Sequence, residues 1–124
     1  MLLDTAVLIL SIESPERLSK RAAAALGNPE NVRELSSISL TEIAIKTTLG
    51  KLKISGEMAR QAIQDMDVHI LPFTADHAFR LFELPAHHRD PFDRPIIAQA
   101  FSEDVPVVTA DESFSLYKGL KLIW

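Results

Sequence analysis

The sequence predicts a three-layer α/β/α sandwich built around a parallel sheet. Short apolar runs alternate with longer helix-like segments along the whole chain, as strands and helices do in α/β proteins. The strand-like runs do not alternate apolar with polar residues, which is expected when helices cover both faces of a parallel sheet. The 124 residues contain no repeat, long linker or low-complexity tract, so residues 1–124 are expected to form a single domain.

In the first part of the chain, "MLL" and "VRELSS" are the expected strands. Ser14 is an N-cap candidate for the second expected helix, Pro15 suits its first turn, and Gly27 suits its end. The segment "SLTEIAIKTTLGKL" predicts a helix that ends at Gly50. The other helices expected here are "TAVLILSI" and about Glu57–Asp67.

In the second part, "VHIL", "PVVT" and "KLIW" are the expected strands. Thr74 is expected to cap a helix that runs to about Leu84. A polar loop, "HHRDPFD", then leads into the apolar helix "PIIAQA". Because proline is tolerated only in the first turn of a helix, Pro95 places the start of this helix near Asp93.

Composition excludes several functional classes. The chain has no cysteine, so disulfides, thiolate metal sites and cysteine nucleophiles are excluded, which suits a cytoplasmic protein. The net charge of −4 provides no overall basic surface for nucleic acid. The apolar start has no preceding Lys or Arg and is interrupted by Asp4, so we expect neither a targeting segment nor a membrane span. Neither G-x-x-x-x-G-K nor G-x-G-x-x-G is present, so nothing in the sequence indicates a nucleotide cofactor.

Carboxylates follow or interrupt apolar runs at positions where a parallel sheet brings residues together. Asp4 follows the first strand, and Asp111 comes two residues after "VVT". Both therefore belong to the edge of the sheet at which α/β proteins bind ligands. Glu42 and Asp93 occupy comparable positions near helix starts, and Asp90 comes one helical turn before Asp93.

Each acid also has a purely structural interpretation. Asp4 and Asp90 can cap the helices that follow them, and Asp111 can open a turn. Glu42 and Ser39 match the S-x-x-E capping box. Neutral residues serve caps equally well, however, whereas several carboxylates at one edge repel one another unless a cation neutralises them. Oxygen ligands favour Mg²⁺ or Mn²⁺, and phosphodiester hydrolysis is the chemistry that fits such a site.

Several residues near these acids have two interpretations. Lys46 either forms an ordinary ion pair with Glu42 four residues earlier or contacts a phosphate. Arg94 either screens the acids or binds an RNA backbone. The hydroxyls of Thr5 and Thr109 either hold a carboxylate or a water, or make local turn bonds. The histidines of "HHRD" are interpreted as polar loop residues, because Mg²⁺ does not favour imidazole.

Taken in order, the blocks "LLDT", "SLTEIAIKTTLGKL", "LPAHHRDPFDRPIIAQA", "VVTAD" and a terminal "IW" resemble PIN-domain ribonucleases. The resemblance is closest to the VapC-type toxins of type II toxin–antitoxin systems and spans nearly the whole chain. It implies a parallel sheet of about five strands flanked by helices. It also implies that Asp4, Glu42, Asp93 and Asp111 form a catalytic Mg²⁺ or Mn²⁺ site, with Asp90 near the metal ligands or facing the substrate.

The same resemblance implies an endoribonuclease that hydrolyses RNA with a metal-activated water, usually as a homodimer. A cognate VapB-type antitoxin would hold it inactive. The helix of "SLTEIAIKTTLGKL" carries apolar residues over a wide face, which indicates either extra core burial or a groove for that partner. Two alternatives stay open: a catalytically silent PIN-like binding module, and an aspartyl-phosphate receiver or phosphotransfer domain with Asp4 as nucleophile.

Overall fold

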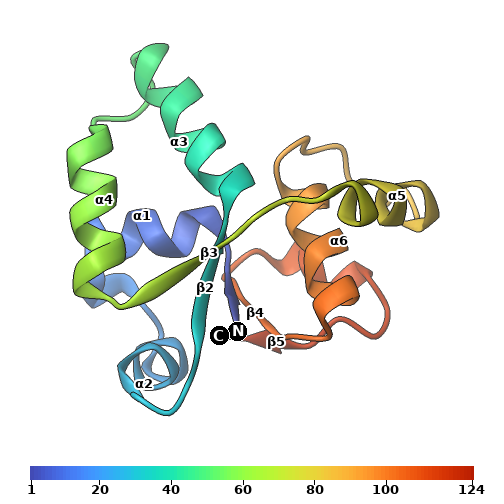
Figure 1. Cartoon of the computed structure of the whole chain (residues 1–124). Coiled ribbons are helices and arrows are strands. Elements are labelled where there is room, and N and C mark those ends of the chain that lie inside the picture. The colour runs from blue at the N-terminus through green and yellow to red at the C-terminus, as the bar shows by residue number, and fades with distance from the viewer.

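The computed structural model describes residues 1–124 and contains a five-stranded, all-parallel sheet flanked by helices (Figure 1). The strands are β1 Leu2–Leu3, β2 Arg33–Ser36, β3 Val68–Leu71, β4 Val107–Val108 and β5 Leu122–Ile123, in the order β3-β2-β1-β4-β5. The helices are α1 Thr5–Glu13, α2 Lys20–Gly27, α3 Ser37–Thr48, α4 Gly56–Asp65, α5 Ala75–Glu83 and α6 Asp93–Glu103. Two 3₁₀ helices, η1 Pro15–Arg17 and η2 Glu112–Leu116, complete the chain.

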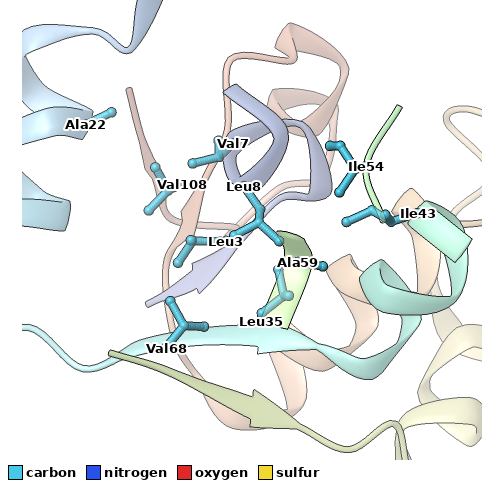
Figure 2. Close-up of a cluster of buried hydrophobic side chains, with 10 residues drawn as sticks. All are labelled: Leu3, Val7, Leu8, Ala22, Leu35, Ile43, Ile54, Ala59, Val68 and Val108. Atoms are coloured by element: carbon cyan, nitrogen blue, oxygen red, sulfur yellow. The ribbon is translucent and has the colours of Figure 1, made fainter. Parts of the chain in front are cut away.

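The three layers arise from strands that bury both faces. Successive strand residues point to opposite faces, so Leu2 and Leu3 enter different cores, as do Val107 and Val108. One core packs Leu3 and Val108 against residues of α1, α2, α3 and α4 (Figure 2). The other packs Leu2 and Val107 against α6 and the residues around η2. The predicted α/β/α sandwich is therefore confirmed.

The topology fixes where a ligand site belongs. The chain builds β1, β2 and β3 outward in one direction, and then crosses over to place β4 on the free side of β1. The order of strands therefore reverses between β1 and β4, and crevices at such a reversal are the usual binding sites of open α/β sheets. Asp4 follows β1 directly, and Asp111 lies just beyond β4.

Two expectations about helix starts are wrong. The helix expected from Pro15 to Gly27 is divided, because Leu18 is extended and the Ser19 hydroxyl accepts a bond from the Ala22 amide to start α2 anew. α3 begins at Ser37 rather than after Ser39, and its cap is Ser36. By contrast, the expected cap at Thr74 and the expected start of α6 at Asp93 are confirmed. No helix has the length and hydropathy that a membrane span requires.

Candidate active site

An acidic cavity of about 380 Å³ opens where β1 and β4 end. It is lined by the start of α1, one face of α3, the loop that leads into α6 and the loop that follows β4. The polar residues that line it are Asp4, Thr5, Glu42, Lys46, Asp90, Asp93 and Asp111. The structure thus gathers all five acids singled out in the sequence around one cavity, although they are up to about a hundred residues apart in the chain.

Asp4 is held as a site residue rather than as a helix cap. It occupies the N-cap position of α1, yet its side chain makes no capping bond and is only 4% exposed. Instead, the Thr109 hydroxyl donates to Asp4 Oδ2 at 2.8 Å and accepts from the Asp111 amide at 3.0 Å. Both interpretations of Thr109 therefore hold at once. Burial raises the pKa of Asp4 to about 6, helped by Glu42 and Asp111 and opposed by the Thr109 bond.

Glu42 has no capping role, because Ser36 caps α3 and the Ser39 hydroxyl accepts instead from Thr5 Oγ1 at 2.8 Å. The capping box of the sequence is therefore wrong, and Thr5 joins α1 to α3 instead of holding a carboxylate. Glu42 Oε2 pairs with Lys46, whose pKa is raised chiefly by that bond. Glu42 Oε1 is buried in the cavity wall without a hydrogen-bond partner, which leaves an acceptor unsatisfied.

Asp90 and Asp93 divide the work of starting α6. Asp90 Oδ1 accepts from the amides of Phe92 at 2.8 Å and Asp93 at 3.0 Å, so the structural interpretation of Asp90 is correct in this geometry. Asp93 is the first residue of α6, and these amide bonds go to Asp90 rather than to its own carboxylate. Burial, together with the charges of the four other acids of the cavity, raises the pKa of Asp93 to about 8. Without a cation, the charged form of Asp93 is therefore disfavoured.

The other two predicted residues differ in placement. Asp111 lines the cavity, and its Oδ1 also accepts from the Ser113 amide at 2.9 Å and hydroxyl at 2.7 Å, so it opens the turn into η2 as well. Arg94 does not line the cavity. Its guanidinium donates to the Pro85 carbonyl at 2.8 Å and the Tyr117 hydroxyl at 3.2 Å, so it anchors the loop instead of screening the acids.

Sequence reasoning missed two residues beside the acids. His88 Nε2 lies 3.4 Å from Asp93 Oδ2, and His88 Nδ1 lies 2.7 Å from the Tyr117 hydroxyl. No local motif marks this pair, because 29 residues separate His88 from Tyr117. Only packing of the loop before α6 against the residue that follows η2 brings them together.

The donor set fits a hard divalent cation. No three His, Asp or Glu side chains are arranged to ligate a metal ion directly. Mg²⁺, however, usually keeps several waters and takes only one or two carboxylates. The unpartnered Glu42 Oε1 and the raised pKa values of Asp4 and Asp93 both indicate negative charge that a cation would neutralise.

The fold and cavity define a parallel α/β protein with an acidic site at its topological switch point. The chain belongs to the PIN domain family, whose profile matches residues 1–120. Among curated proteins no match was found.

Solved toxin–antitoxin structures share the fold. The structure is similar to VapBC2 from Rickettsia felis bound to a DNA fragment from their promoter, with TM-score 0.71, 21% identity, and coverage of 98% of this chain and 95% of that one. DNA-bound VapBC from Salmonella typhimurium gives TM-score 0.71, 20% identity, and coverage of 98% and 94%. VapBC-5 from Mycobacterium tuberculosis gives TM-score 0.60 and 22% identity, with coverage of 98% of this chain and 94% of that one.

Proposed function

We propose that this protein is a Mg²⁺- or Mn²⁺-dependent endoribonuclease that acts as the toxin of a toxin–antitoxin pair. The observation that carries the proposal is the convergence of Asp4, Glu42, Asp93 and Asp111 on one cavity of a PIN domain. Burial and the charges of neighbouring carboxylates oppose the ionisation of Asp4 and Asp93, which is the electrostatic condition that a cation relieves. When bound, the cation would activate water and neutralise phosphate oxygens.

The side chains of the cavity have separate tasks in this proposal. Asp4, Glu42, Asp93 and Asp111 would hold the cation, directly or through water. Thr109 orients the Asp4 carboxylate by donating to one of its oxygens. Lys46 engages one oxygen of Glu42 and leaves the other free. Asp90 fixes the first turn of α6 and thereby the position of Asp93.

An apolar groove between α3 and α4 supports the antitoxin part of the proposal. The groove encloses about 530 Å³, and Leu40, Ile43, Ala44 and Ile63 are among its lining residues. Next to it, Ile45 and Leu49 are 43% and 63% exposed. We propose that a segment of a VapB-type antitoxin covers this surface, as exposed apolar patches commonly mark partner sites. Solved structures with the same fold include a member of the VapBC family of toxin–antitoxin systems. We also propose the homodimer that the resemblance implies and the cytoplasmic location that the absence of cysteine suits.

Incubation of the purified protein with RNA tests the catalytic proposal. We expect endonucleolytic cleavage with Mg²⁺ or Mn²⁺, none with chelator, and loss of cleavage in Asp4→Asn. Sequencing of RNA ends after induction in cells identifies the substrate. Metal binding without cleavage of any RNA would favour the silent binding module. Phosphorylation of Asp4 by a small phosphodonor would favour the receiver.

A further inference from the structure

A row of side chains connects the loop before α6 with Asp93. Arg94 Nη1 lies 3.2 Å from the Tyr117 hydroxyl, which lies 2.7 Å from His88 Nδ1. His88 Nε2 in turn lies 3.4 Å from Asp93 Oδ2. Tyr117 is only 2% exposed, and its ring also contacts His87 edge-on, with centroids 4.9 Å apart. The row is therefore packed into the protein rather than mobile on its surface.

The direction of the hydrogen bonds follows from the donors available. Arginine can only donate, so the Tyr117 oxygen accepts from Arg94. The single Tyr117 proton then has one acceptor, His88 Nδ1, because the oxygen makes no other hydrogen bond. A neutral imidazole that accepts at Nδ1 carries its proton on Nε2, the nitrogen that faces Asp93. The reverse tautomer would leave the Tyr117 proton without an acceptor inside the protein.

His88 Nε2 lies beside the Asp93 carboxylate without a formed hydrogen bond. It is buried and has no hydrogen-bond partner of good geometry, and the Asp93 carboxylate is the group that it approaches. The amide bonds at the start of α6 go to Asp90 and not to the Asp93 carboxylate. Asp4 is held by Thr109 and Glu42 by Lys46, so His88 is the corresponding neighbour of Asp93.

We infer that His88 is a positioning residue that orients Asp93 for cation binding, and that Tyr117 fixes the tautomer with which it does so. The inference rests on the proposed function, because Asp93 is a metal ligand only under that proposal. Partners that hydrogen-bond a ligating carboxylate typically contribute about 10–100-fold to metal affinity. Tyr117 acts one step further away, so we expect its contribution at the lower end of that range.

Tyr117→Phe is the sharpest test, because it removes one hydroxyl and retains the buried ring. Two measurements apply: calorimetric titration with Mn²⁺, and the ¹⁵N spectrum of the histidines in the full-length protein with saturating Mg²⁺. We expect His88 in the wild type to show the Nε2–H tautomer, and in the variant to show a mixture. We expect the Mn²⁺ affinity of the variant to fall about tenfold. Ser11→Ala, which removes a hydroxyl bond to the Val7 carbonyl outside the cavity, should change neither.

A pair of His88 variants separates positioning from packing. Glutamine can still present an N–H toward Asp93, whereas leucine fills the space without a donor. We expect His88→Gln to retain most of the Mn²⁺ affinity and His88→Leu to lose about 10–100-fold. If the wild type binds Mn²⁺ and both Tyr117→Phe and His88→Leu bind it equally well, the role of His88 is wrong while the proposed metal site stands. A wild type that binds no Mn²⁺ would overturn the proposed metal site and the role of His88 with it.

Discussion

The two sides of α3 differ: one faces the acidic cavity and the other faces the apolar groove. One side presents Glu42 and Lys46 to the acidic cavity, where carboxylates from distant segments are crowded together. The other side presents Leu40, Ile43 and Thr47 to the apolar groove against α4. In the cavity the unfavourable feature is uncompensated charge, and in the groove it is apolar area in contact with water.

The chemistry of each surface indicates which kind of ligand or partner it would bind. Charge repulsion among buried carboxylates is relieved by a cation and not by an apolar chain. Exposed apolar area is relieved by an apolar segment and not by an ion. One helix therefore joins the site of the proposed reaction to the site of the proposed inhibitor. We expect substitutions on one side of α3 to leave the binding or activity of the other side unchanged.

Asp4→Asn should have the largest effect, and only on the acidic side. Asparagine keeps an oxygen for the Thr109 bond, so the fold should persist, and metal-free stability should rise because one repulsive charge is gone. RNA cleavage should fall by at least about 100-fold, since a metal ion supplies several kcal/mol of transition-state stabilisation. Cleavage assays and thermal melts measure both. Asp104→Asn, at an exposed left-handed position that suits asparagine, is the matched control and should be silent.

Glu42→Gln tests the acidic side on α3 itself. Because Glu42 caps nothing, the variant loses only the Lys46 pair and a charged ligand. Folding should change by no more than about 1 kcal/mol, since the partner lysine is partly exposed. Cleavage and Mn²⁺-induced stabilisation should both collapse, while antitoxin binding stays unchanged. A variant that cleaves RNA at the wild-type rate would make Glu42 structural.

Ala44→Glu tests the apolar side. A carboxylate placed in the groove would have to be buried by the antitoxin segment without a partner, which costs ~1–3 kcal/mol, or roughly 10–100-fold in affinity. RNA cleavage by the free protein should be unaffected. The same substitution at the exposed Ala24 of α2 is the control. Co-purification and calorimetry with the antitoxin give the affinities; full affinity in Ala44→Glu would move the interface elsewhere.

The last effect concerns stability alone and is read as a change of melting temperature with pH. Asp4 and Asp93 have folded pKa values of about 6 and about 8 against ordinary values of 3.8, so between pH 4 and 8 the folded state binds more protons than the unfolded state. Metal-free stability should therefore decrease as the pH rises through this window.

Saturating Mg²⁺ should counter that decrease, because the cation competes with the protons; at a hundredfold excess over Kd it adds ~2.7 kcal/mol. Melts with Mg²⁺ and with chelator across this pH range measure both effects. The metal-free Asp93→Asn variant should lose most of the slope at the upper end of the window. An unchanged slope in that variant would assign the effect to other groups.

Local sequence signals determined much of the architecture. All five expected strands form, and the two that are buried on both faces, β1 and β4, are apolar runs without polar alternation. The Thr74 cap and the Pro95 constraint placed two helix starts, because both act through the backbone within a single turn. Local signals failed where several hydroxyls competed for one helix start, as Ser36 and Ser39 did.

The sequence by itself also singled out the acids, because carboxylates beside apolar runs can be recognised from the order of residues alone. Which of them act as caps was decided only in the tertiary structure. Asp90 accepts hydrogen bonds from local amides, whereas Asp4 accepts from Thr109, 105 residues away. The roles of Arg94, His88 and Tyr117 were likewise invisible in the sequence. A side chain's chemistry is fixed by its type, but its partner depends on the packing of segments that no local pattern connects.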